Sequence, residues 1–135
     1  MSAALKAIVP VLRVADVERS MKWYPAVLGF TPDPFPAAPP FEFAMLTLGR
    51  AELMLRRWPG FSRPTDTPGW DAYLRLDRGA IREVYERLAK TPYVARRLER
   101  MPYGLAEFEI RDPDGHRLCF GEAVDAGEDV PNASE

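Results

Sequence analysis

The feature that most constrains this chain is a repeated order of strand and helix patterns. "VLRVAD" at 11–16 precedes a helical pattern that ends in "WYPAVLGF", and "YLRLDR" at 73–78 precedes one that contains "VYERLAK". The offset is about 60 residues, and such an internal period indicates two copies of one structural unit. The sequence therefore predicts an α+β fold of two βαβββ repeats, which form one curved eight-stranded sheet with helices outside and a groove inside.

The first repeat is expected over about 7–60, with strands at 7–14, 41–49 and 51–58. A helix is expected to begin after Asp16, which suits an N-cap, and to end at Gly29, with a kink or an early last turn at Pro25. Five prolines between 32 and 40 indicate an extended loop. Pro10 cannot donate a ladder hydrogen bond, so the first strand is expected at a sheet edge or a subunit boundary.

The second repeat is expected over about 70–123. Its helix is expected at 79–90, and its strands at 71–77, 105–112 and 116–122. The stretch 93–100 is ambiguous, and "PDG" at 113–115 joins the last two strands. We expect 1–124 to be a single domain and 125–135 to be an acidic, flexible tail.

Composition excludes several classes of protein. The formal net charge is -2, so there is no basic field for nucleic acid or an acidic membrane. A single cysteine excludes an internal disulfide framework, and no apolar run approaches the ~20 residues of a membrane span. We expect a cytoplasmic protein that binds neither nucleic acid nor membrane.

The quoted motifs point to a family. "PVLRVADVERSMKWY", "LGRAELMLRRWPG", "AYLRLD" and "EFEIRDPDGHRLCFGE" make the chain similar, over nearly all of 7–123, to the vicinal oxygen chelate superfamily. That superfamily includes glyoxalase I, extradiol dioxygenases, fosfomycin-resistance proteins and bleomycin-resistance proteins. "LMLRRWPGF" and the "FGE" ending most resemble the bleomycin-binding branch. The superfamily hosts many chemistries, so the fold alone does not assign a function.

The resemblance implies where a metal would bind. Metal enzymes of the superfamily use four ligands on the inner sheet face, and the corresponding positions here are Val9, Met54, Asp71 and Cys119. Valine cannot ligate, and a methionine thioether suits only soft metals. The inherited site therefore looks dismantled. We expect no metal or other cofactor, and no catalytic residue is assigned.

The "DPDG" hairpin holds the chain's only histidine. His116 is interpreted as a solvated turn residue, and Asp112 and Asp114 as turn formers. Cys119 is interpreted as a small apolar lining residue instead of a nucleophile, because no histidine is placed to activate it.

Strand alternation from the four inherited positions predicts which side chains line the groove. Its aromatic members could hold a planar ligand, and its acids a cationic one. Arg13 and Arg75 occupy equivalent positions in the two repeats. They would either bind an anion or neutralise the nearby glutamates, and both interpretations stay open. The predicted lining is Arg13, Met54, Arg56, Trp58, Phe61, Trp70, Asp71, Tyr73, Arg75, Tyr103, Glu107, Glu109 and Cys119.

Three functions remain open. The first is a metal-free binding protein that sequesters an aromatic or cationic compound such as a bleomycin-type antibiotic, and thereby confers resistance. The second is a lyase, isomerase or dioxygenase with an atypical or absent metal site and a carboxylate of raised pKa as general base. The third is a structural dimer with a vestigial groove. The resemblance implies a homodimer whose subunits share the ligand groove, with Pro10 marking the interface strand.

Overall fold

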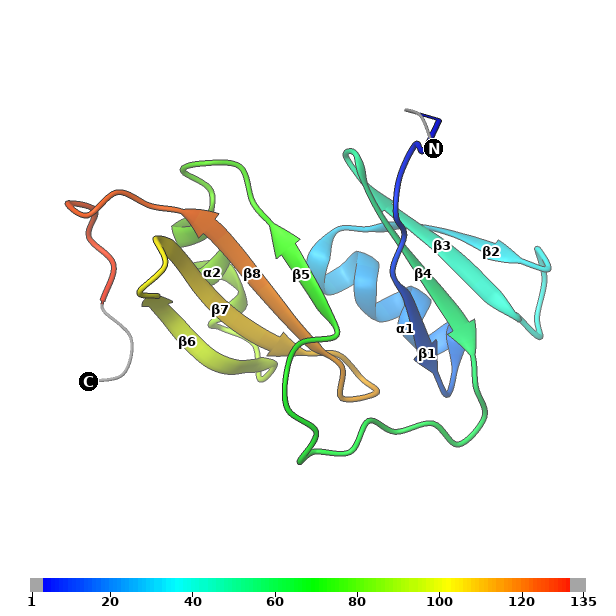
Figure 1. Cartoon of the computed structure of the whole chain (residues 1–135). Coiled ribbons are helices and arrows are strands. Elements are labelled where there is room, and N and C mark those ends of the chain that lie inside the picture. Colours follow the sequence, from blue (N-terminus) through cyan, green and yellow to red (C-terminus); the bar gives the residue numbers. More distant parts are fainter. Residues whose placement is uncertain (1–3, 132–135) are drawn as a thin grey trace. The chain divides into compact units, whose positions relative to one another are not determined.

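The computed structural model describes residues 4–131, and the chain divides into two compact units, Met1–Ser62 and Arg63–Glu135. Each unit contains one four-stranded mixed sheet and its own α-helix (Figure 1). This confirms the predicted α+β fold of two βαβββ modules. The single-domain organisation, the joining of the two sheets into one and the groove between them stay predictions.

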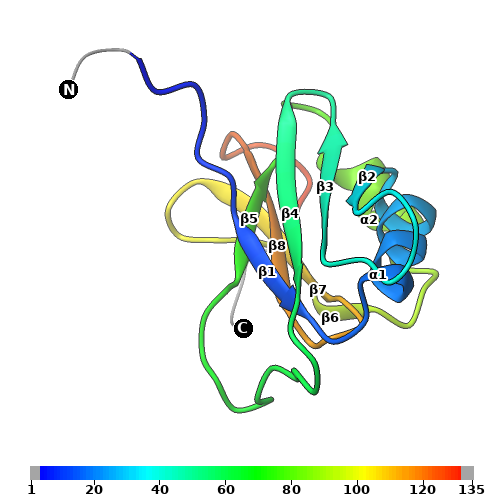
Figure 2. The ribbon, with the colours of Figure 1, turned by 90° about the vertical axis from the view of Figure 1, so that its right-hand side faces the viewer.

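Unit 1 contains β1 (Val11–Val14), β2 (Thr31–Phe35), β3 (Phe43–Leu48) and β4 (Ala51–Arg57). The sheet order is β1-β4-β3-β2, in which β1 pairs parallel to β4 and the other pairs are antiparallel. Alternate residues such as Leu12, Val14, Leu53 and Leu55 are buried, and α1 packs on that side of the sheet (Figure 2).

The helix of unit 1 follows the predicted signals. α1 (Val17–Trp23) begins after Asp16, whose side chain accepts a hydrogen bond from the amide of Arg19. A π-helical turn, η1 (Tyr24–Leu28), follows and contains Pro25. Proline has no backbone N–H to donate, so the regular α-helix ends at this point, as predicted. Gly29 ends the turn at φ 86°.

The proline-rich stretch 32–40 was predicted to be a loop, and this prediction is wrong for residues 32–35, which lie in a strand. β2 occupies Thr31–Phe35 and pairs with β3 alone, so it is an edge strand. Its prolines, Pro32 and Pro34, stand at alternate positions. An edge strand needs ladder donors on one side only, so prolines at every second residue are compatible with it.

Unit 2 contains β5 (Ala72–Arg75), α2 (Ile81–Leu88), β6 (Val94–Arg100), β7 (Leu105–Arg111) and β8 (Arg117–Ala123), with sheet order β5-β8-β7-β6. The ambiguous stretch is therefore the edge strand β6, whose pairing with β7 contains register shifts. On the helix side, Phe108 stacks on Phe120 with ring centroids 4.9 Å apart, and Tyr85 of α2 meets Phe108 edge-on.

A carboxylate from the sheet caps α2. The helix has no side-chain N-cap of its own, and Glu122 of β8 instead accepts hydrogen bonds of 2.7 Å from the amides of Ala80 and Ile81. A negative charge at a helix N-terminus satisfies free amide donors and the helix dipole together. The glutamate of the "FGE" motif therefore ties α2 to β8.

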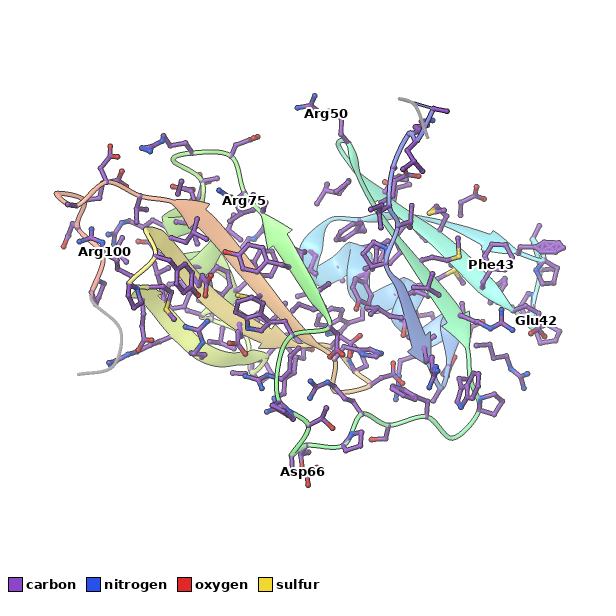
Figure 3. All side chains as sticks on the ribbon, in the orientation of Figure 1. Glu42, Phe43, Arg50, Asp66, Arg75 and Arg100 are labelled. Atoms are coloured by element: carbon purple, nitrogen blue, oxygen red, sulfur yellow. The ribbon has the colours of Figure 1, made fainter. Side chains whose placement is uncertain are left out.

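The segment after β8 is held by arginines as far as residue 131. The guanidinium of Arg100 donates to the carbonyls of Asp125, Ala126 and Glu128, and its amide donates to the carbonyl of Pro131 (Figure 3). The predicted flexibility of 125–135 stays a prediction, and 132–135 lie outside the described residues. Among the described residues, none of the helices has the length and apolarity needed to cross a membrane.

Candidate functional site

The face of the unit 2 sheet opposite α2 carries the predicted acidic and aromatic residues. Because Phe108 and Phe120 point to the helix, their neighbours point the other way. We call this side the polar face; its central members are Tyr73, Glu107, Glu109, Cys119 and Gly121. The strand register places Glu109 beside Cys119 and Glu107 beside Gly121.

Glu107 is fully buried and receives three donors. The phenols of Tyr73 and Tyr103 each donate to it at 2.8 Å, one to each carboxylate oxygen. Arg96 of β6 adds a 3.3 Å contact from Nη2. The carboxylate therefore fixes two aromatic side chains, one from β5 and one from the loop before β7.

Glu109 is only 3% exposed and is equally well paired. The indole N–H of Trp70 donates to it at 3.1 Å, and Nε of Arg96 at 2.7 Å. Arg117 donates from two guanidinium nitrogens, at 2.6 Å and 3.0 Å. Buried carboxylates are tolerated when they are paired in this way, so the two glutamates and two arginines form one compensated network.

The network sets the protonation states on the polar face. Burial by itself would raise the pKa of Glu109, but hydrogen bonds from Arg96, Arg117 and Trp70 outweigh it and lower the pKa. Burial, with the nearby Glu107, raises the pKa of the Cys119 thiol to about 12. Burial and the hydrogen bond to Glu107 raise the pKa of Tyr103 to about 12, and they raise that of Tyr73 as well. Glu109 is thus ionised at neutral pH, while the thiol and both phenols keep their protons.

Gly121 makes the position of Tyr73 possible. A Cβ built on Gly121 would lie 1.7 Å from Oη and 2.3 Å from Cζ of Tyr73. The phenol ring therefore crosses β8 at the one residue without a side chain, and reaches Glu107 on β7. The glycine is a packing requirement here, because its backbone does not need a positive φ.

Asp71 and His116 lie in a different cluster, at the start of unit 2. Asp71 forms an ion pair with Arg63, whose Nε lies 2.5 Å from the carboxylate, and it accepts a hydrogen bond from the amide of Arg117 at 2.9 Å. His116 is 4% exposed, with Nδ1 3.6 Å from the Asp71 carboxylate. The prediction that His116 is solvated is therefore wrong, because the loop after Ser62 folds over the hairpin and covers it. Asp112 is confirmed as a turn former, since it accepts from the amides of Asp114 and His116.

Arg63 organises the loop that carries Trp70. Its guanidinium is buried and donates to the carbonyls of Thr67 at 3.0 Å and Gly69 at 2.9 Å. The same side chain pairs with Asp71. One buried arginine thereby closes the loop 63–71 and fixes the residue before Asp71, which is Trp70.

The predicted lining residues of the first repeat belong to unit 1. Arg13 on β1 lies over the Trp58 ring, 4.5 Å from its centroid, so this arginine makes a cation–π contact. Met54 is half-buried and pairs in register with Val11, while Arg56 is exposed. Phe61 is half-buried in the segment after β4. Trp70 and Tyr73 are brought together in unit 2, with ring centroids 5.1 Å apart.

The residues at the inherited metal positions do not fit a metal. Asp71 is occupied by Arg63, and the Cys119 thiol is protonated at neutral pH. Val9 offers no donor, and Met54 offers only a thioether. Among residues 4–131, no group of three or more His, Cys, Asp or Glu side chains is arranged to hold a metal ion.

Two members of the network escaped sequence reasoning. Arg96 lies in the ambiguous stretch 93–100, and Arg117 follows the chain's only histidine. A signal was present for Arg117, because the short "PDG" hairpin fixes the register that places it diagonally across from Glu109. No comparable signal exists for Arg96, since the register shifts in β6 decide where its side chain points.

Comparison with known proteins places this chain in a family. The family model described as Glyoxalase/Bleomycin resistance protein/Dioxygenase superfamily matches residues 6–120. TioX from Micromonospora sp. ML1 is similar in structure, with 24% identity, TM-score 0.68, and coverage of 88% of this chain and 99% of that one. A search of the curated proteins found no match.

Two further solved structures show the same fold. A glyoxylase/bleomycin resistance protein/dioxygenase domain from Frankia sp. EAN1pec has 23% identity and TM-score 0.71, covering 91% of this chain and 96% of that one. A bleomycin-binding protein complexed with bleomycin has 22% identity and TM-score 0.67, covering 89% and 100%. With the family model matching most of its length, this chain belongs to the Glyoxalase/Bleomycin resistance protein/Dioxygenase superfamily.

Proposed function

We propose that this protein is a small-molecule-binding protein that holds a planar aromatic ligand on the polar face of unit 2 and needs no metal to do so. One observation carries the proposal. Trp70, Tyr73 and Tyr103 have their polar ends anchored to buried carboxylates, while Trp70 stays 44% exposed and Tyr103 56% exposed. The hydrogen bonds to the buried carboxylates hold the three rings in place, and the exposed ring surface is available to a ligand.

Anchoring of this kind favours binding because it reduces the entropy lost on association. A free surface tryptophan or tyrosine must give up rotamer freedom when a ligand stacks on it, at a cost of roughly 0.5–1.5 kcal/mol per side chain. Here the hydrogen bonds to Glu107 and Glu109 already fix the side chains. Offset or edge-to-face aromatic pairs then add about 0.5–1.5 kcal/mol each beyond the area they bury.

The protonation states favour binding over catalysis on this face. A general base would be served by a carboxylate with a raised pKa, whereas the pKa of Glu109 is lowered. A cysteine nucleophile would need a lowered thiol pKa, whereas that of Cys119 is raised to about 12. Together with the donor set at the inherited metal positions, these states support the metal-free form of the proposal.

The pairing of the acids favours an aromatic ligand over a cationic one. Glu107 and Glu109 are buried and matched by Arg96 and Arg117, so neither is a bare carboxylate awaiting a cation. Sequestration of an aromatic antibiotic is one use of such a face, and resistance would follow from it. The bleomycin-binding protein among the similar structures makes bleomycin the first such compound to test.

We also propose that the protein works as a homodimer with the N-terminal strand at the interface. Within residues 4–131, β1 pairs only with β4 in its sheet, so it is an edge strand whose other side no strand of that sheet covers. The carbonyl of Pro10 accepts from the amide of Met54, and the segment before it exposes Leu5 and Ile8, the latter by 90%. Sedimentation equilibrium tests this: an Ile8→Asp variant is expected to dissociate at concentrations where the parent is dimeric, and a monomeric parent would refute the dimer.

A tryptophan-fluorescence titration tests the binding proposal. Chelator-treated protein is titrated with metal-free bleomycin and with 2-naphthalenemethanol, a neutral planar probe. Saturable quenching is expected in the parent and in Trp58→Phe, and it should be lost in Trp70→Phe, because Trp23 is buried and Trp58 lies in unit 1. Quenching that survives in Trp70→Phe, or that requires added metal, would contradict the proposal.

A further inference from the structure

The charges of the polar face can be counted side chain by side chain. Its three acids are Glu99, Glu107 and Glu109, and each lies within 3.3 Å of an arginine. Glu99 pairs with Arg97 at 3.1 Å, Glu107 with Arg96 at 3.3 Å, and Glu109 with both Arg96 and Arg117. Three arginines therefore match three glutamates, and the network is neutral as a whole.

Two further arginines, Arg75 and Arg111, belong to this face and form no ion pair with a carboxylate of the described residues. Arg75 follows Tyr73 by two residues on β5 and lies in register with Gly121, so strand alternation puts it on the polar face. Arg111 lies two residues after Glu109 on β7, in register with Arg117. Within residues 4–131, neither guanidinium makes a hydrogen bond or an ion pair. The polar face thus carries a surplus of positive charge.

The guanidinium of Arg96 occupies the position beside Glu107 and Glu109 that a cationic ligand would need. Arg96 reaches from the edge strand β6 to Glu107 and Glu109, and its Nη2 lies 3.9 Å from the sulfur of Cys119. A cation approaching the two acids would have to displace this guanidinium and break its charge-assisted hydrogen bonds. The aromatic N–H and O–H donors also point inward to the acids, so the surface offered outward is ring face and phenol oxygen.

We propose that the polar face selects planar aromatic ligands that carry a negative charge, such as an aromatic carboxylate or phosphate. The ring of the ligand stacks on Trp70 and Tyr73, and its anionic group is attracted by the surplus positive charge of the face. Arg75 is level with Gly121 and Arg111 with Arg117, so the two arginines lie toward opposite ends of the face and act through their combined field. Arg75 is exposed at the end of β5, two residues after Tyr73, and Figure 3 labels it there. Burial and Glu107 raise the pKa of the Tyr73 phenol, and the positive charge of Arg75 acts in the opposite direction without outweighing them. The inference rests on the proposed aromatic-binding function and adds the charge of the ligand.

The experiment compares three probes that share one ring system and differ in charge. Isothermal titration calorimetry at low ionic strength measures 2-naphthoate, 2-naphthalenemethanol and 2-naphthylmethylammonium against the parent protein. The expected order of affinity is anion, then neutral, then cation, with the anion bound about two- to fivefold more tightly than the neutral probe, as exposed ion pairs allow. This preference should shrink as salt is added.

Variants assign the preference to the two arginines. Arg75→Gln and Arg111→Gln should each reduce the affinity ratio of 2-naphthoate to 2-naphthalenemethanol. In the double variant the two affinities should become equal, because both ion-pair contributions are gone. Affinity for 2-naphthalenemethanol should be unchanged in all of them. Arg87→Gln is the matched control, since Arg87 is an exposed arginine on α2, which packs on the opposite side of the sheet.

The outcomes separate this inference from the function on which it rests. Binding of the neutral probe with no anion preference, with a cation preference, or with a preference that survives in the double variant would overturn the inference and leave aromatic binding intact. Failure of all three probes to bind would overturn the proposed function, and the inference with it.

Discussion

A single methyl group on β8 should disrupt the aromatic site. In Gly121→Ala the new Cβ would fall 1.7 Å from Oη of Tyr73, so the phenol must move by more than 1 Å, or leave the face, to reach normal contact. Its 2.8 Å hydrogen bond to the buried Glu107 would then be lost. Losing a hydrogen bond to a charged group costs about 1.5–3 kcal/mol, and forced overpacking costs about 1–3 kcal/mol. We expect the free energy of unfolding to fall by about 2–5 kcal/mol.

Urea unfolding measures this loss, and a second variant isolates its cause. In a Tyr73→Val background the ring is absent, so Gly121→Ala should cost less than about 0.5 kcal/mol or stabilise the strand slightly. The difference between the two backgrounds is the steric coupling. Equal effects in both backgrounds, or a loss below about 0.5 kcal/mol in the parent, would refute the crossing of Tyr73 over Gly121.

Three further predictions follow from the same contacts. Glu122→Gln should lower the free energy of unfolding by about 1–2 kcal/mol in urea, because the cap of α2 loses its charge; an unchanged midpoint would contradict that role. Cys119, with its thiol pKa raised to about 12, should resist a thiol reagent at pH 8.5 until the protein unfolds, whereas rapid native labelling would show it accessible. The folded-state pKa of Glu109 is lowered, so its contribution to stability is present above its ordinary pKa of 4.5 and is lost as pH falls through the folded value; a Glu109→Gln variant should therefore lose stability less steeply than the parent below pH 4.5 in acid titrations.

The repeat and the strand alternation could be predicted because they are local patterns. Leu12, Val14, Leu53 and Leu55 alternate with polar residues, and the period of two fixes which face is buried. The edge strand β2 could not be predicted in this way, because its prolines are tolerated only where one side of the strand has no partner strand. Edge position is a property of the assembled sheet, and a single segment does not carry it.

The candidate site was predicted in part for the same reason. Placing Glu107 and Glu109 on one face needed only alternation, and the structure confirms that they share it. Their counterions come from β6 and β8, and the contact between Arg96 and both acids depends on register shifts that no short motif encodes. The burial of His116 depends on a loop anchored by Arg63, some fifty residues earlier in the chain.

The most direct test of the central claim is the indole region of a ¹H–¹⁵N spectrum of chelator-treated protein. Three tryptophans give three indole N–H signals, which single Trp→Phe variants assign. We predict that adding 2-naphthoate shifts the Trp70 signal, held by Glu109, in a saturable way, and leaves the signal of the buried Trp23 unchanged. A Trp70 signal that stays in place at saturating probe, or that moves only after a divalent metal is added, would contradict metal-free aromatic binding on the polar face.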